Sequence, residues 1–461
     1  MNLNVLLEEY LKDNRIFQIA DRLVLSKPQR IFLKNLNGSA SQFVFGSVFR
    51  HDLASQLNHL VILNDAEEAA YFHNTLENLT SALNAFYFPS SFKNRKNYRQ
   101  LNASHVMLRT EMLTRFSTAT GNRVGAVVTY PEALFEKVVL PKTLSGNIIR
   151  IKAGDSINVS ELLSQFVDYG FERTDFVYEP GQFALRGGIL DIYSFGNEKP
   201  YRIELFGNDV DSIRIFDPET QLSERKLLQV TIIPNVETQF DTGEKVSLLE
   251  FLPDNTAIWV QDWDVVKEKL NVQEEDLEIF FRVQETAKKP VNDDDNLEKK
   301  DVTGDDFVPV AAIEEQLQLR HMVEFGHTPH FGGIEITFDT REQPSFNRQF
   351  DFLIRDLKSW EAKQYHIYLF AENPRQLERV HSIFADLKAE IQFTPIPISI
   401  HGGFIAHDLK VVCYTDHQIF QRYHKYRVKQ AYNKNKALTL RALRELQPGD
   451  YVTHIDHGVG I

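Results

Sequence analysis

The sequence predicts a multidomain α/β protein in which a β-rich α+β unit interrupts a domain built on a parallel sheet. Strand and helix patterns alternate over residues 1–145 and return after residue 237, which is the order that produces a parallel sheet. Between them, residues 174–235 alternate β-forming residues with glycine-containing turns, as short antiparallel strands do. A chain of 461 residues is too long for one core, so three or four domains are expected.

Composition and charge narrow the class of protein. Hydrophobic residues make up 43% and charged residues 25% of the chain, as is typical of globular proteins. The net charge of −13 argues against a surface devoted to nucleic acid and favours a protein partner. The one cysteine, Cys413, excludes an internal disulfide and indicates a reducing cytoplasm. No apolar run approaches the ~18–20 residues that a membrane span needs.

The first α/β segment consists of strand–helix repeats. Residues 59–63 are a predicted strand, and Asp65 can cap the helix that follows it. The next predicted elements are helices over 66–83 and 102–118, a buried strand over 123–129 and a short helix over 132–139. In the β-rich unit, a helix over 159–169 stops at Gly170, and short strands follow it.

After the β-rich unit, helices return and a further α/β unit follows. The charged region 288–306 is predicted to be a solvated loop. Strands are predicted over 256–260, 334–338, 365–370 and 409–414, helices over 350–363 and 373–387, and an extended piece over 397–400. A basic helical linker is predicted over 421–446, and the chain stops soon after a new strand begins, so we expect it to be part of a longer protein.

A degenerate phosphate loop is the nearest approach to a nucleotide site. Such a loop needs a glycine turn entering a helix, a Lys for the phosphates and a Ser or Thr for magnesium. Gly38 and Ser39 provide the turn, but Ser41 and Gln42 stand where Lys and Thr are required. The loop is therefore predicted to be inactive, since the charge that complements a triphosphate is missing.

Other residue patterns give no catalytic or metal site. His454, Asp456 and His457 are a weak candidate for metal ligation. A second histidine group is too loosely spaced to favour ligation over a polar loop; it consists of His321, His327 and His330. No Gly-x-Ser-x-Gly turn or persuasive pair of acidic residues is present. We therefore predict no catalytic residues, no bound metal and no cofactor for this chain.

Arginines in the β-rich unit are the strongest candidates for function. Arg186 precedes a Gly-Gly turn, and Arg202 and Phe206 share one face of a predicted strand, with Arg214 on the next. Arginine and an exposed aromatic together are typical of a protein-binding surface. The alternative is structural: Arg202 pairs with Asp209 or Asp211, and Phe206 fills the core of the unit.

The stretch PGQFALRGGILDIYSFGNEKPYRIELFGNDVDSIRIFDPETQ resembles the module shared by the repair helicase UvrB and the bacterial transcription-repair coupling factors (Mfd). The degenerate phosphate loop and the tail LQPGDYVTHIDHGVGI favour the coupling-factor family. In that family the tail opens an RNA-polymerase-interacting domain. The resemblance thus indicates the N-terminal part of a coupling factor.

The resemblance implies a domain order and a partner. It divides the chain into UvrB-like domain 1a (1–145), the UvrA-binding domain 2 (146–236), domain 1b (237–342), an α/β domain 3 (343–432) and a basic linker with the start of the polymerase-binding domain (433–461). The family's UvrA-binding positions correspond to Arg186, Arg202 and Phe206. ATP and Mg²⁺, duplex DNA and RNA polymerase would be bound by C-terminal domains that this sequence lacks. In the resting family members those domains also mask domain 2.

Two alternatives follow from the same residues. A UvrB-type ATP-dependent helicase is the alternative enzyme reading, and it would require ATP binding at Ser41 and Gln42. Direct DNA binding through the basic segments 93–99 or 421–444 would give steeply salt-dependent affinity for duplex DNA.

Overall fold

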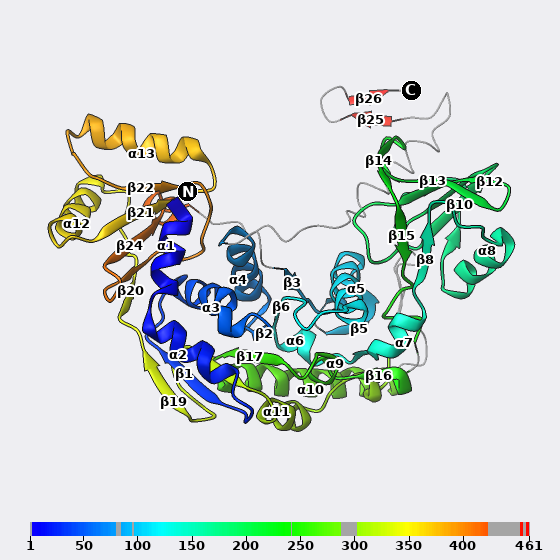
Figure 1. Cartoon of the computed structure of the whole chain (residues 1–461), viewed down its shortest axis with the longest axis horizontal. Helices are drawn as coiled ribbons and strands as arrows, with labels where there is room; N and C mark the ends of the chain where they lie inside the picture. Colours follow the sequence, from blue (N-terminus) through cyan, green and yellow to red (C-terminus); the bar gives the residue numbers. More distant parts are fainter. Residues whose placement is uncertain are drawn as a thin grey trace.

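A seven-stranded parallel sheet forms the centre of the protein, as the computed structural model shows (Figure 1). The residues that the structure describes are 2–79, 84–94, 96–240, 242–286, 302–422, 452–454 and 458–460. The strands of the parallel sheet, in spatial order, are β19 (Ile334–Thr337), β1 (Arg30–Lys34), β18 (Met322–Phe325), β17 (Thr256–Gln261), β2 (Asn58–Ile62), β6 (Ala126–Thr129) and β3 (Ala85–Tyr87). One sheet is therefore assembled from segments on both sides of residues 149–232.

Helices cover both faces of the parallel sheet. Helices α3 (Ala40–Arg50) and α4 (Ala66–Leu79) lie on one side, and α10 (Trp263–Thr286) and α11 (Val310–Gln318) run along the other (Figure 1). Strand β2 is accordingly buried at every position, as expected for a parallel strand covered on both faces. The predicted α/β class with a parallel sheet is confirmed.

The β-rich unit leaves this body through a paired neck. Its first strand, β8 (Ile149–Lys152), pairs antiparallel with its last, β15 (Gln229–Ile232). Because the two ends of the unit are hydrogen-bonded together, the unit can extend from the parallel sheet without disturbing it. Between them lies a six-stranded sheet in the order β14 (Ser223–Leu227), β13 (Asp209–Phe216), β12 (Tyr201–Phe206), β11 (Ile189–Ile192), β10 (Gln182–Arg186) and β9 (Glu172–Arg173).

A second α/β unit follows the parallel sheet along the chain. Its five strands, in order, are β20 (Thr340–Glu342), β23 (Phe404–Ala406), β24 (Val411–Thr415), β21 (His366–Phe370) and β22 (Thr394–Ile396), with α12 (Phe350–Ala362) and α13 (Pro374–Asp386). Part of this sheet joins the core of the parallel-sheet body, because Phe370 and Phe404 pack on Phe43 of α3. The second α/β unit thus packs directly on a helix of the parallel-sheet body.

The remaining described elements lie outside these three sheets. They are α1 (Asn2–Leu11), α2 (Asn14–Leu23), β4 (Phe92–Asn94), β5 (Asn97–Leu101), α5 (Ala103–Thr118), α6 (Pro131–Leu134), β7 (Val138–Val139), α7 (Pro141–Gly146), α8 (Val159–Asp168), β16 (Lys245–Val246), α9 (Leu248–Phe251), α14 (Asp416–Ile419), β25 (Val452–His454), β26 (Gly458–Gly460) and three short 3-10 turns. No helix among the described residues is long and apolar enough to cross a membrane.

Several sequence-based predictions of elements need correction. The helix predicted over 132–139 ends at Leu134, and Val138–Val139 instead pairs with β16, because a cross-strand partner outweighs the local helical pattern. The extended piece predicted over 397–400 lies three residues too late, since the strand is Thr394–Ile396. Strand β18, buried at all four positions, was missed.

Three predictions fall largely or wholly outside the described residues. The charged loop is described only from residue 302 onward, the basic linker only to residue 422, and the tail only at 452–454 and 458–460.

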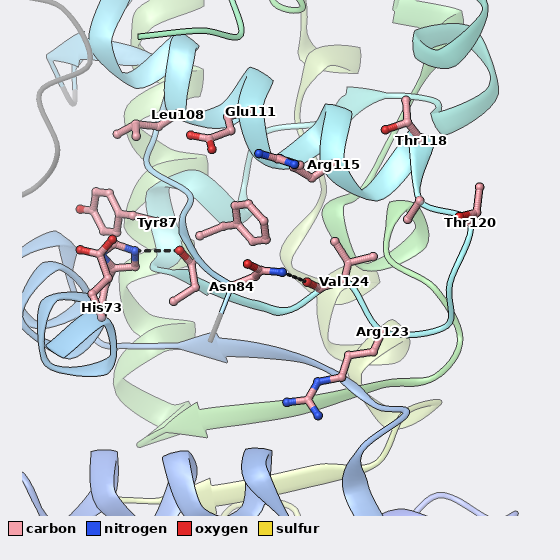
Figure 2. A pocket seen from close by; sticks show the side chains of 14 residues that line it. His73, Asn84, Tyr87, Leu108, Glu111, Arg115, Thr118, Thr120, Arg123 and Val124 are labelled. Carbon is pink, nitrogen blue, oxygen red and sulfur yellow. Dashed lines mark hydrogen bonds and ion pairs between the residues drawn. The ribbon is translucent and has the colours of Figure 1, made fainter. Parts of the chain in front are cut away.

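A cavity of about 570 Å³ opens between the C-terminal ends of α4 and α5, beside β3 (Figure 2). Two of the side chains that line it donate hydrogen bonds to backbone carbonyls. Arg123 donates to the carbonyl of Phe49 at 2.7 Å and lies 3.5 Å from the centre of the Phe49 ring. Asn84 donates to the Val124 carbonyl at 3.1 Å. These lining side chains therefore tie the segment before β6 to α3 and to the segment before β3.

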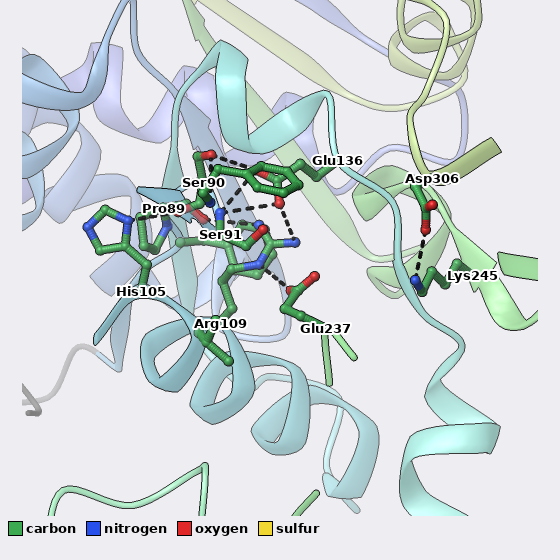
Figure 3. Close-up of polar contacts among 12 residues, drawn as sticks. Pro89, Ser90, Ser91, His105, Arg109, Glu136, Glu237, Lys245 and Asp306 are labelled. Carbon is green, nitrogen blue, oxygen red and sulfur yellow. Dashed lines mark hydrogen bonds and ion pairs between the residues drawn. The ribbon is translucent and has the colours of Figure 1, made fainter. Parts of the chain in front are cut away.

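A fully buried arginine joins the exit of the neck to the parallel-sheet body (Figure 3). The Nε of Arg109, on α5, donates to Glu237 Oε1 at 2.6 Å, and its Nη2 lies 3.3 Å from Glu136 Oε2. Its Nη1 donates to the Pro89 carbonyl at 3.0 Å. Burial and the neighbouring Glu237 raise the pKa of Glu136, while the Arg109 guanidinium lowers it. One cation thus serves two buried carboxylates from distant parts of the chain.

Replacing Arg109 by Met is expected to destabilise the protein by about 3–5 kcal/mol, because it leaves buried carboxylates without their cation. The free energy of unfolding in urea would measure this. Arg115→Met, on the exposed side of the same helix, is the matched control and should change stability by less than about 0.5 kcal/mol. Equal effects of the two substitutions would contradict the role given to Arg109.

A neutral histidine in the core makes stability depend on pH. His59, on β2, is fully buried, and its Nδ1 accepts a hydrogen bond from Trp259 Nε1 at 3.1 Å. Burial is the main cause that lowers the pKa of His59 from 6.5 to about 3. In the unfolded chain the imidazole takes up a proton below pH 6.5, whereas in the folded protein it stays neutral down to about pH 3. The contribution of the neutral His59 ring to the free energy of unfolding is therefore complete above pH 6.5 and is lost as the pH falls below that value.

Between pH 6.5 and 5.5, wild type should lose about 1 kcal/mol more stability than a His59→Gln variant, which has no titrating ring. Urea unfolding at the two pH values would measure the difference. An identical pH dependence for the two proteins would show that His59 is not held neutral.

Candidate functional site

The candidate site lies on one face of the six-stranded sheet, whose strands alternate their side chains between two faces. Leu190 and Ile203 lie on the opposite face, in the core of the unit. On the candidate face, Asp191 of β11 lies opposite Arg202 of β12, and Arg202 lies opposite Arg214 of β13. The register therefore places two of the predicted arginines in a row with an aspartate.

Asp191 holds two arginines at once. Its carboxylate is fully buried. Arg186 Nη2 donates to Asp191 Oδ2 at 2.6 Å. Arg202 Nε donates to Oδ1 at 2.8 Å and its Nη2 donates to Oδ2 at 2.9 Å. A buried charge is tolerated when it is paired and hydrogen-bonded, and a two-point arginine–carboxylate contact also fixes the orientation of the guanidinium.

Aromatic rings support both guanidiniums. Arg186 lies 4.5 Å from the centre of the Phe176 ring and also donates to the backbone carbonyl of Asp175. Arg202 lies 4.4 Å from the centre of the Phe216 ring. The exposed fraction of the side chain is 34% for Arg186 and 14% for Arg202. Arg186 is therefore the more accessible of the two, and Arg202 is held largely within the unit.

Phe206 is the most exposed part of the site. It ends β12 just before Gly207, whose φ of +65° makes the turn into β13. Its side chain is 85% exposed, and Ile189, 37% exposed, lies on the adjacent strand opposite Glu204. An aromatic ring left almost wholly in water has no role in the core of the chain that holds it.

A third charge pair completes this face. Arg214 Nη2 lies 3.5 Å from Glu204 Oε2, and the hydroxyl of Ser212 donates to the same oxygen. The surface formed by Arg186, Ile189, Glu204, Phe206 and Arg214 is called the Phe206 surface below. It combines apolar and charged groups, as protein-binding surfaces do.

The structure tests the structural alternative for Arg202 and Phe206. The structural alternative is wrong in both parts: Arg202 pairs with Asp191, not with Asp209 or Asp211, and Phe206 does not fill the core. Asp191 was missed by sequence reasoning. Its signal was an acidic residue inside an otherwise apolar strand, Ile-Leu-Asp-Ile, which requires a buried partner.

The degenerate phosphate loop is filled by another part of the chain. Gly38 has a φ of +54°, and Ser39 is fully buried at the start of α3. The Ser39 amide donates to the Gly402 carbonyl at 2.9 Å, and the Gly402 amide donates to Ser39 Oγ at 3.0 Å. Ser41 donates to the side chain of Gln42 at 3.1 Å. The amide that enters the helix is thus already bonded within the chain.

The histidines form ion pairs and hydrogen bonds. His327 Nδ1 lies 3.0 Å from Asp262 Oδ2, and this contact raises the pKa of His327. His330 Nδ1 lies 2.8 Å from Asp264. His321 Nδ1 accepts a hydrogen bond from the Gln29 amide at 3.2 Å. The described residues contain no group of three or more His, Cys, Asp or Glu that could hold a metal ion.

The C-terminal histidine group cannot be placed in the same way. His454 is in β25, but nothing is described of its side chain, and Asp456 and His457 lie outside the described residues.

Comparisons with known proteins connect the β-rich unit and most of the chain to DNA repair proteins. A family model described as the UvrB interaction domain matches residues 149–237. The transcription-repair-coupling factor of Bacillus subtilis (strain 168) is 25% identical, over 93% of this chain and 41% of the relative. That of Staphylococcus haemolyticus is 21% identical, over 99% of this chain and 43% of the relative. The predicted resemblance to coupling factors is confirmed, and the chain spans about two fifths of the length of these relatives.

Asp191→Asn is expected to lower the free energy of unfolding by about 1.5–3 kcal/mol, since it weakens charged hydrogen bonds to two arginines. Asp211→Asn, at an exposed position on β13, is the control and should stay within about 0.5 kcal/mol of wild type. Urea unfolding of the three proteins would measure both values. A negligible effect of Asp191→Asn would mean that the buried carboxylate does not organise the site.

Proposed function

We propose that this chain, which is similar to transcription-repair coupling factors over most of its length, is a recruitment module of transcription-coupled nucleotide excision repair. Its β-rich unit binds the repair protein UvrA through the Phe206 surface and so brings excision repair to stalled RNA polymerase. The observation that carries the proposal is the 85% exposure of Phe206 beside two arginines that Asp191 holds in fixed positions, on a unit matched by the UvrB interaction domain.

The Phe206 surface suits a partner with an apolar socket rimmed by acidic groups. Phe206 can be buried on docking without any rearrangement of its own chain, because it is already exposed. Arg186 retains an accessible guanidinium edge that can donate to a carboxylate at the rim. Since Asp191 already orients this side chain, less conformational entropy is lost on binding than for a free arginine.

The remaining activities of the family are proposed for the longer protein. There, RNA polymerase, duplex DNA, ATP and Mg²⁺ are bound by further domains, and movement along DNA depends on ATP hydrolysis. Those domains also mask the Phe206 surface at rest, so the present chain should bind UvrA more tightly than the longer protein does.

A UvrB-type helicase is the alternative. It requires nucleotide at the phosphate loop, where Ser41 and Gln42 replace the Lys and Thr of the motif. The Ser39 amide is bonded to Gly402, which also opposes nucleotide binding. Saturable ATP binding with turnover by this chain would favour the helicase.

Phe206→Ala should weaken UvrA binding by at least about tenfold, because a central aromatic of a binding surface contributes about 2 kcal/mol or more. Isothermal titration calorimetry with purified UvrA would measure the change in Kd. Leu228→Ala is the matched control, since Leu228 is 86% exposed on the same unit but lies outside the Phe206 surface. Its Kd should stay within about twofold of wild type.

Charge reversal of the arginines affects both binding and folding. Arg186→Glu and Arg202→Glu each place a carboxylate against the buried Asp191, so both should weaken UvrA binding and lower the melting temperature. The loss of stability should be larger for Arg202→Glu, because Arg202 donates to both oxygens of Asp191. Full UvrA affinity in a Phe206→Ala, Arg186→Glu double variant would refute the site.

A further inference from the structure

The degenerate phosphate loop touches a segment more than 350 positions away along the chain. Residues 399–403, called the strap here, connect β22 to β23 in the second α/β unit. The strap and the loop exchange two hydrogen bonds: Ser39 N–H to the Gly402 carbonyl at 2.9 Å, and Gly402 N–H to Ser39 Oγ at 3.0 Å. A reciprocal pair of this kind fixes both segments in register.

The backbone of the strap lies where only glycine fits. A Cβ built on Gly38 would come within 2.6 Å of the Gly403 carbonyl oxygen and 2.9 Å of the Gly402 carbonyl oxygen. A Cβ on Gly402 would come within 3.0 Å of Gly38 Cα. Two carbonyl oxygens therefore press against the glycine turn that begins α3.

Further contacts are made by the strap and by the phosphate loop. His401 stacks on Tyr71 of α4, with ring centres 3.7 Å apart, and Asn78 of the same helix donates to the Ser399 carbonyl at 3.2 Å. On the other side, Asn37 binds Thr340 of β20 through its amide at 2.9 Å and its side chain at 2.8 Å. The strap thus also contacts α4, and the loop also contacts β20.

Electrostatics explains why a carbonyl oxygen is favourable at the N-terminus of α3. The first turn of a helix has N–H groups without intrahelical partners and a partial positive charge. In nucleotide-binding loops, phosphate oxygens satisfy them. In this chain the lysine that would select a phosphate is absent, and a neutral carbonyl, whose dipole needs no counter-charge, accepts the Ser39 amide instead.

We propose that the phosphate loop has become a docking seat for the strap, which holds the second α/β unit permanently on the parallel sheet and excludes nucleotide. This seat does not depend on UvrA binding. The group that occupies the phosphate loop is the strap of the same chain. Displacement of the strap by a free anion would refute the proposal.

Hydrogen–deuterium exchange of the Ser39 amide in the 461-residue chain tests the seat directly. In wild type this amide should exchange at least about 100-fold more slowly than an unstructured amide. Gly402→Val should speed its exchange at least about tenfold, because the added side chain forces the strap off Gly38. Gly146→Val is the control, since a Cβ there meets nothing within 4 Å. Wild-type exchange at the rate of an open loop would overturn the proposal.

Two further variants keep the test decisive. If Gly402→Val does not fold, Ser39→Ala removes only the acceptor of the Gly402 amide, and exchange at residue 39 should rise about fivefold; no change would count against the seat. Ser41→Lys with Gln42→Thr restores the side chains of the phosphate motif. With the strap seated, this variant should show no saturable ATP binding, and micromolar affinity would overturn the proposal.

Discussion

The ion network of Arg109 is the constraint on which the architecture depends. The strands of the parallel sheet come from both sides of a long insert. The chain must therefore return, after the insert, to the position at which it left the sheet. The paired neck does this geometrically, and Arg109 does it electrostatically by binding Glu136 before the insert and Glu237 after it. Because a buried carboxylate without a cation is costly, the exit of the insert has one low-energy position against α5.

The same principle operates on a smaller scale in the candidate site. Asp191 is a buried carboxylate that two arginines satisfy together. The arginines are therefore only partly available to a partner, and Phe206 is the group that the unit leaves free. For the proposed binding function, we therefore expect the aromatic ring to provide the main apolar contact and Arg186 to provide orientation at its edge.

The proposal that this chain does not bind nucleotide has two separate grounds. The sequence lacks the lysine that complements phosphate, and the fold places Gly402 on the amide that phosphate would need. These grounds support each other, because a loop that does not bind a charged ligand can instead form hydrogen bonds with a neutral backbone carbonyl. A glycine turn that no longer serves catalysis can in this way be retained for packing.

Features that depend on neighbouring residues could be predicted from the sequence. Periodicity predicted α8, α12, α13 and the strands β2, β17, β19 and β24 to within a few residues, and the Gly-Gly turn after Arg186 predicted the β10–β11 hairpin. The long-range contacts described above could not be predicted in this way. Glu237 lies 128 residues from Arg109, and Gly402 lies 363 from Ser39. Local preferences carry no information about such pairs, because their energy arises only when folding removes both groups from water.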